Sequence, residues 1–220
     1  MTSLRTTGRA VAAASAAALL IAATGAALAQ APPPTPVPAG AAYVAIGLFP
    51  ARSGGRLAVS SPGFAEGRDI PFEYTGWRAN TFPGLSWSKG PPGTRSYVAL
   101  LQDADGLLGG NDAILHWTMY DIPPEVTSLR LGMTAPPPGA MAGPNRNGPA
   151  KGYLGPRTGA GPKHRYPFQV FALDIVIPAD PDISWAALKA AMKDHVLASG
   201  QTVGLGQLDP TAAPGPPPAR

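Results

Sequence analysis

The chain has 220 residues, a formal net charge of +4 at pH 7, 27 glycines, 28 prolines and no cysteine. The lack of cysteine excludes a disulfide framework and thiolate chemistry. Two of the basic residues, Arg5 and Arg9, precede an apolar N-terminal stretch, and leaving them out lowers the charge from +4 to +2. The remaining chain has no Lys/Arg cluster, which excludes nucleic acid as a partner.

Residues 1–29 have the pattern of an export signal. Two arginines precede an alanine-rich apolar stretch from Val11 to Leu28, and the segment ends in the small-residue pattern Ala-Leu-Ala. We expect cleavage before Gln30 and a periplasmic or secreted protein. The alternative is an uncleaved membrane anchor, but polar residues and glycine interrupt the stretch and make it marginal for spanning roughly 30 Å of hydrocarbon.

The mature chain is predicted to contain one folded domain. Residues 30–42 (QAPPPTPVPAGAA) are proline-rich without apolar periodicity and are typical of an extended linker. Residues 210–220 (PTAAPGPPPAR) are expected to be a disordered tail. The domain therefore spans residues 43–209, and about 165 residues suffice for one core but not for two.

Glycine and proline divide this domain into short apolar runs of strand length, a pattern typical of an all-β protein. The candidate strands are Arg56–Ser60, Tyr97–Asp103, Ala113–Asp121, Tyr166–Ile177 and Gln201–Leu208.

The run AILHWTMYD is the most informative of these strands. Strand alternation places Ile114, His116, Thr118 and Tyr120 on one face, and Leu115, Trp117 and Met119 on the other. Both faces are largely apolar. We therefore expect a central strand that is covered on both sides.

One segment, DISWAALKAAMKDHVLASG, has helical periodicity. Ser184 is the expected N-cap, apolar residues recur at helical spacing, and Gly200 is the expected end. His195, near that end, is predicted to make a favourable contact with the helix dipole and to have no chemical role. These elements predict a β-rich domain with a C-terminal helical cover.

Ionisable residues occur within or beside three of the apolar runs. Asp103 and Asp105 lie in LLQDADG, His116 in LHW and His164 in KHRY. Each has a structural explanation: the aspartates suit a turn before Gly106, and a histidine in an apolar strand is commonly a neutral core residue. These explanations stay open at this point.

A glycine-rich connection leads into His164. It contains the Gly155-Pro156 pair, a rigid turn whose neighbouring backbone N–H groups could point at an anion. This turn favours a binding site over the purely structural explanations.

Six segments, in this order, carry a family resemblance: SSPGFAEGRDIPFEYTG (60–76), PGLSWSKGPPGTRSYVALLQDAD (83–105), HWTMYDIPPEVTSL (116–129), GPNRNGPAKGYLGP (143–156), HRYPFQVFALD (164–174) and AALKAAMKDHVLASGQTVGLG (186–206). Through them the chain resembles the phosphatidylethanolamine-binding protein family, in its bacterial Raf-kinase-inhibitor-like branch. The resemblance covers nearly the whole domain. It implies an all-β dominated fold, a sandwich of two antiparallel sheets with a C-terminal helix.

The same resemblance implies a surface pocket that binds phosphate, phospholipid head groups or carboxylates. The residues that match the family's ligand-binding motifs are Asp103, Asp105, His116, Gly155, Pro156, His164 and Tyr166. Histidine gains charge near pH 6.5, so two imidazoles suit an anionic ligand, and Asp103 is assigned to orienting one of them. No cofactor is expected. A protein partner in the cell envelope and a homodimer stay open.

Two other classes of function stay open as well. Carboxylate and imidazole together also suit general acid–base catalysis on a small substrate, although GLSWS lacks the second glycine of a Gly-x-Ser-x-Gly elbow. The same side chains include donors for a divalent metal, but DADGLLGGNDAI has leucine and isoleucine where a calcium loop needs oxygen ligands. We expect neither a catalytic residue nor a metal ligand among them.

Overall fold

The structure is a computed structural model that describes residues 1–2, 44–107 and 112–211. The predicted linker, nearly all of the predicted export signal and most of the predicted tail lie outside these residues, so the predicted domain boundaries stay predictions. No helix in the described part of the chain has the length and apolar character needed to span a membrane.

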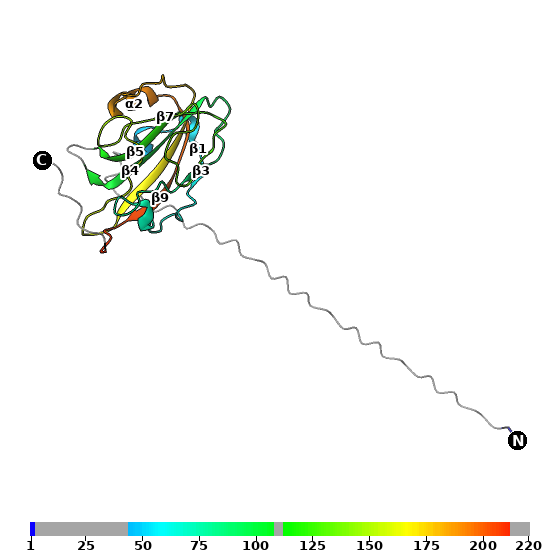
Figure 1. Cartoon of the computed structure of the whole chain (residues 1–220). Coiled ribbons are helices and arrows are strands. Elements are labelled where there is room, and N and C mark those ends of the chain that lie inside the picture. The colour runs from blue at the N-terminus through cyan, green and yellow to red at the C-terminus, as the bar shows by residue number, and fades with distance from the viewer. Residues whose placement is uncertain (3–43, 108–111, 212–220) are drawn as a thin grey trace. The chain divides into compact units, whose positions relative to one another are not determined.

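The larger sheet of the described residues has six strands and carries the candidate site (Figure 1). In spatial order its strands are β1 (Gly55–Arg56), β9 (Val196–Gly206), β8 (His164–Leu173), β4 (Ser96–Leu107), β5 (Ala113–Ile122) and β7 (Met141–Ala142). Neighbouring strands are antiparallel, except that β1 runs parallel to β9.

The smaller sheet has three antiparallel strands, β2 (Val59–Ser60), β3 (Leu85–Trp87) and β6 (Ser128–Leu129). Its side chains pack with one face of the larger sheet in a core rich in aromatic residues. In that core Trp87 packs edge-on against Tyr97, with ring centroids 5.5 Å apart, and Phe64 packs on Phe168 at 5.2 Å. Burial of each such side chain contributes about 2 kcal/mol. The predicted β-rich fold of two sheets is confirmed.

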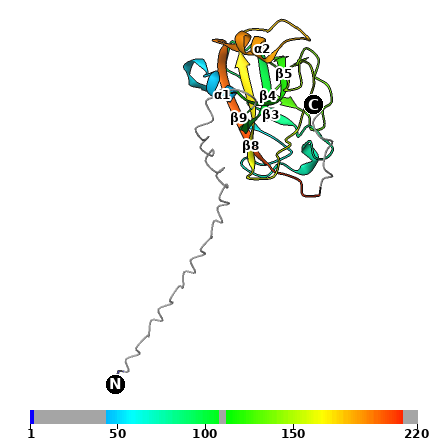
Figure 2. The ribbon, with the colours of Figure 1, turned by 90° about the vertical axis from the view of Figure 1, so that its left-hand side faces the viewer.

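Helices cover the opposite face of the larger sheet. These are α1 (Ala45–Leu48), which lies beside β9 in Figure 2, and α2 (Trp185–Met192). Leu188 and Met192 of α2 are fully buried with Phe171 of β8. The side chain of Ser184 accepts the N–H of Ala187 and caps α2, as predicted. Two short 3-10 helices, η2 (Arg52–Gly54) and η3 (Phe72–Tyr74), complete the described elements.

The predicted helix was too long at its C-terminal end. Helix α2 ends at Met192, and β9 begins at Val196. From Val196 onward buried and partly exposed residues alternate along the chain, and this period of two belongs to a strand. His195 therefore lies between the two elements, and its Nδ1 contacts Oδ1 of Asp174 at 2.8 Å instead of the helix end.

Four predicted strands also had wrong limits. Strand β4 continues past Asp103 to Leu107, and β9 ends at Gly206 and not at Leu208. The run Arg56–Ser60 is divided between β1 of the larger sheet and β2 of the smaller one. Strand β8 ends at Leu173 and not at Ile177, because the following Asp174 turns to pair with His195 and Arg52. Strand β5 is buried along most of its length, as expected for a strand covered on both faces.

Candidate functional site

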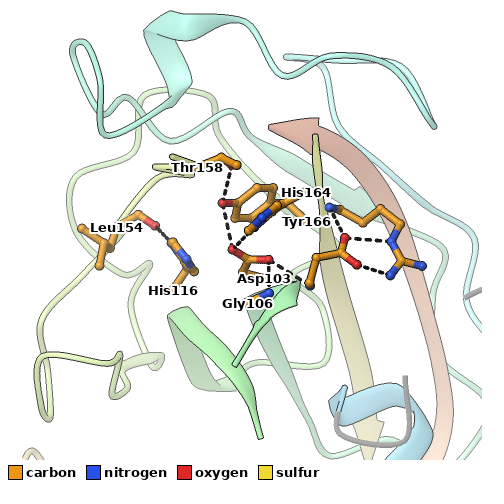
Figure 3. A network of polar contacts seen from close by, with 9 residues as sticks. Asp103, Gly106, His116, Leu154, Thr158, His164 and Tyr166 are labelled. Carbon is orange, nitrogen blue, oxygen red and sulfur yellow. Dashed lines mark hydrogen bonds and ion pairs between the residues drawn. The ribbon is translucent and has the colours of Figure 1, made fainter. Parts of the chain in front are cut away.

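Asp103 of β4 is the centre of a buried polar cluster (Figure 3). Its Oδ1 accepts the backbone N–H groups of Asp105, at 3.0 Å, and Gly106, at 2.8 Å. Its Oδ2 contacts Nδ1 of His164 at 2.9 Å and accepts the hydroxyl of Tyr166 at 3.1 Å. Four donors therefore surround a carboxylate whose side chain is only 5% exposed.

His164 and Tyr166 reach Asp103 from β8 because residues two apart in a strand project from the same face. Tyr166 is fully buried, and its hydroxyl also contacts Thr158 Oγ1 at 2.8 Å. Burial, followed by the charge of Asp103, raises the pKa of Tyr166. The phenol therefore stays neutral and donates to the carboxylate, while Thr158 donates to the phenol.

His116 joins the cluster through a β-bulge. Leu101 pairs with Trp117, but Gln102 pairs with Leu115, so His116 is the extra residue on β5. Its ring therefore lies on the Trp117 side and packs edge-on against Tyr166, with centroids 5.3 Å apart. The expected alternation, which placed His116 and Trp117 on opposite faces, was wrong at this position because a bulge resets the alternation.

The environment of His116 favours the neutral ring. Burial lowers the pKa of His116 below the ordinary value, and the positive charge of Arg146 lowers it further. The contact of Nδ1 with the carbonyl of Leu154, at 2.9 Å, and the charge of Asp103 raise the pKa but do not outweigh burial. A proton on Nδ1 is required for the hydrogen bond to a carbonyl oxygen. Nε2 of the neutral ring is then a lone-pair acceptor, and protonation converts it into a donor.

The backbone of the Gly155-Pro156 turn packs between other segments and is already hydrogen-bonded. The N–H of Gly155 donates to Oδ1 of Asn80 at 2.7 Å, and the carbonyl of Pro156 accepts the N–H of Gly76 at 2.9 Å. The N–H of Leu154 donates to the carbonyl of His116 at 3.2 Å. The expectation that these N–H groups point at an anion was therefore wrong for Gly155 and Leu154. The turn instead holds Leu154 against His116.

The side chain of Asp105 does not join the cluster around Asp103. Its carboxylate accepts the backbone N–H and the Nε–H of Arg165, at 2.8 and 2.9 Å, and pairs with the rest of the guanidinium. Partial burial raises the pKa of Asp105, but the hydrogen bonds and charge of Arg165 outweigh it, and the net pKa lies below the ordinary value. Of the seven predicted site residues, Asp103, His116, His164 and Tyr166 come together, and Asp105 lies apart from them.

The two aspartates also close the gap between β4 and β8. Among the described residues, backbone pairing of these strands ends at Leu101 and Phe168. Beyond that point the connections are the contacts of Asp103 with His164 and Tyr166 and those of Asp105 with Arg165. Side-chain carboxylates thus replace the backbone ladder at the end of the sheet that carries the site.

Sequence reasoning missed Thr158, Asn80 and Leu154 as supports of the site. The contact between Asn80 and Gly155 joins positions 75 apart, and no motif marks either Asn80 or Thr158. Asn80 has a φ of 54°, a left-handed conformation that asparagine tolerates better than most residues. Within residues 44–107 and 112–211, no group of three His, Asp or Glu side chains is arranged to hold a metal ion.

Comparison with known proteins gives consistent matches. The sequence profile of the phosphatidylethanolamine-binding protein family matches residues 60–207. The UPF0098 protein of Aquifex aeolicus is 33% identical over 174 residues, which are 77% of this chain and 99% of that protein. A Mycobacterium tuberculosis protein with the name lipoprotein LppC is 33% identical over 153 residues, 69% of this chain and 72% of its own length.

Two solved structures share the fold. The Chlamydia trachomatis homologue CT736 has a TM-score of 0.63 and 29% identity, and the match covers 70% of this chain and 99% of that one. Escherichia coli YbcL, described as a member of the mammalian PEBP family, has a TM-score of 0.62 and 28% identity, with 70% and 100% covered. The fold therefore agrees with that of solved bacterial structures.

Proposed function

Because this chain belongs to the phosphatidylethanolamine-binding protein family, and is on that ground a small-ligand-binding protein, we propose that it binds the anionic group of a small molecule at His116 and His164. Phosphate, a phospholipid head group and a carboxylate share this chemistry. The described site offers two imidazoles from different strands around one buried tyrosine.

The observation that supports the proposal is the way in which both imidazoles are held. Asp103 binds Nδ1 of His164, and the carbonyl of Leu154 binds Nδ1 of His116. In both rings Nε2 is therefore the nitrogen that can meet a ligand. The side chain of His164 is 28% exposed, so a ligand can reach it from solvent. A protonated Nε2 supplies both a donor and a positive charge to an anion.

Anion affinity should therefore rise as the pH falls. The lowered pKa of His116 keeps that ring neutral in the free protein, and a bound anion raises the pKa by favouring the imidazolium. We expect calorimetric affinity for sulfate, which keeps one charge state across this range, to increase steadily from about pH 8 to pH 5. Flat affinity over this range would remove the imidazoles from the proposal.

Asparagine variants test the two rings separately. Asparagine preserves a donor near the position of Nδ1 but lacks Nε2 and cannot become charged. His116→Asn and His164→Asn should each lower sulfate affinity at about pH 6 by at least tenfold, because a charge-assisted hydrogen bond is lost. His195→Asn is the matched control, since His195 pairs with Asp174 just past the far end of β8. Unchanged affinity in both site variants would contradict the proposal.

An acid–base enzyme is the second candidate. The specific observation in its favour is the contact of Asp103 with His164, because a carboxylate behind an imidazole is also how general bases are oriented. Turnover of p-nitrophenyl acetate or p-nitrophenyl phosphate that is lost in His164→Asn would favour the enzyme. Saturable sulfate binding without turnover favours the binding protein.

We further propose that the protein is exported and acts in the cell envelope, where it can modulate a partner protein. The support is the N-terminal pattern of two arginines, an apolar stretch and Ala-Leu-Ala. Mass spectrometry of the protein from its native cells should find a mature N-terminus at Gln30. An intact N-terminus at Met1 in the cytosolic fraction would contradict export.

A further inference from the structure

The backbone of Arg146 is held beside the anion site. Its N–H donates to the carbonyl of Leu115 at 2.9 Å, and Leu115 directly precedes His116 on β5. The same connection also binds the next residue of the strand, since the N–H of Leu154 donates to the carbonyl of His116 at 3.2 Å. Arg146 and Leu154 are therefore attached to two successive residues of β5, and His116 is the second of them.

A rigid turn presents Arg146 at this place. Asn145 is buried, its Oδ1 accepts the N–H of Asn147 at 2.8 Å, and its Nδ2 donates to the carbonyl of Gly152 at 3.1 Å. The backbones of Asn145 and Gly148 exchange two further hydrogen bonds, at 2.9 and 3.0 Å. Arg146 itself is exposed on this turn, so it can meet a ligand without a rearrangement of the backbone.

The positive charge of Arg146 is not compensated by a carboxylate. The two basic residues next to His164 are each paired with an aspartate, whereas Arg146 has no ion-pair partner within the described part of the chain. The charge of Arg146 nevertheless acts on the site, because it lowers the pKa of His116. An anionic ligand can therefore gain an ion pair here that the protein alone does not make.

The other groups of the site do not favour a second negative charge on the ligand. Oδ2 of Asp103 lies 2.9 Å from Nδ1 of His164, and the charge of this carboxylate repels an anion. A neutral His116 ring supplies no charge in return. Arginine keeps its proton in proteins, and its planar group binds phosphate oxygens in pairs. Arg146 is therefore the group here that can favour a doubly charged ligand over a singly charged one.

We propose that Arg146 is a ligand-binding residue of the anion site and selects a doubly charged phosphate monoester, in a small molecule or a lipid head group, over a singly charged anion. This inference rests on the proposed function, since Arg146 adds a contact to the anion that His116 and His164 bind. A phosphate monoester has three free oxygens, so two can meet the imidazoles while the third meets the guanidinium.

Phenyl phosphate and phenyl sulfate are the matched probes for this selection. They have the same shape, but at about pH 7 the phosphate is mostly doubly charged and the sulfate is singly charged. Calorimetry with the full chain should show that phenyl phosphate binds about tenfold more tightly. Arg146→Gln should abolish this preference. Arg56→Gln, the control, should keep it, because it removes the same charge from β1, which pairs with β9 far from the end that carries His164.

Arg146→Lys separates the effect of charge from that of structure, because lysine keeps the charge but not the planar group. This variant should keep a preference of about threefold or more. An unchanged preference in Arg146→Gln, or a complete loss in Arg146→Lys, would overturn the inference. Phenyl sulfate binding that depends on His116 and His164 would then still support the proposed function, whereas no saturable binding of either probe would contradict both.

Vesicles distinguish the two sources of such a ligand. Phosphatidic acid in phosphatidylcholine vesicles exposes a phosphate monoester, and phosphatidylglycerol in the same vesicles exposes a phosphodiester. Competition of the phosphatidic acid vesicles with phenyl phosphate, weakened in Arg146→Gln, identifies a lipid head group. Selective binding of phenyl phosphate without competition from either vesicle identifies a soluble monoester. Equal competition by both vesicles would contradict the selection by charge.

Discussion

Asp103→Asn should lower the free energy of unfolding by about 3 kcal/mol, because two of the four donors around the carboxylate would then face an amide NH₂ group. One carboxyl oxygen accepts the N–H groups of Asp105 and Gly106, and the other contacts His164 and Tyr166. Asparagine can satisfy one side only. Urea unfolding followed by circular dichroism, with an unchanged m-value, measures this loss.

Asp105→Asn is the matched control for this prediction. Asp105 lies two positions further along β4 and has the same side chain, but its partner is Arg165 at a partly exposed position. Exposed ion pairs contribute little, so this variant should lose at most about 1 kcal/mol. Equal losses in the two variants would contradict the central role of Asp103. Sulfate affinity should also fall in Asp103→Asn, because His164 loses the group that fixes its Nδ1 proton.

Gly155→Ala should be the second most damaging substitution, costing about 3 kcal/mol of unfolding free energy through overpacking. A Cβ atom at this position would lie 2.5 Å from the backbone oxygen of Tyr74, 2.9 Å from Oδ1 of Asn80 and 3.0 Å from the backbone nitrogen of Gly76. Two of these atoms belong to the backbone, which cannot move away cheaply. The displaced turn would also pull the carbonyl of Leu154 away from His116.

Gly159→Ala provides the comparison within the same connection. A Cβ atom there meets no atom within 4 Å. The expected change is within about 0.5 kcal/mol of zero, and a small stabilisation follows if the unfolded chain loses freedom. Thermal unfolding of both variants measures the difference. A Gly155→Ala protein as stable as Gly159→Ala would show that the turn packs less tightly than described.

The sequence allowed four of the cluster residues to be found through the family resemblance. His164 and Tyr166 could be paired by strand spacing alone, since they lie two positions apart in one run. The position of His116 could not be predicted in this way, because a β-bulge leaves no clear mark in AILHWTMYD and only the pairing with β4 reveals it. Asp103 and Asp105 have the same side chain and similar neighbours in sequence, yet the strand directs one inward and one toward Arg165.

The C-terminal elements show a different limit of sequence reasoning. The stretch from Val196 to Gly200 continues the helical spacing of α2 and equally fits the alternation of a strand. In the structure this stretch is a strand, because β9 pairs with β8 along its whole length. Asn80 could not be predicted for a similar reason, since its contact with Gly155 joins segments 75 positions apart.

Strands β4 and β8 are joined in two physically different ways along their length. Up to Leu101 and Phe168 the joint is a backbone ladder, which has no titratable group, whereas beyond that point Asp103 and Asp105 supply it. The ion pair of Asp105 with Arg165 weakens in salt, whereas the backbone ladder does not. High salt can therefore loosen the sheet at its ligand-facing end while its other half stays closed.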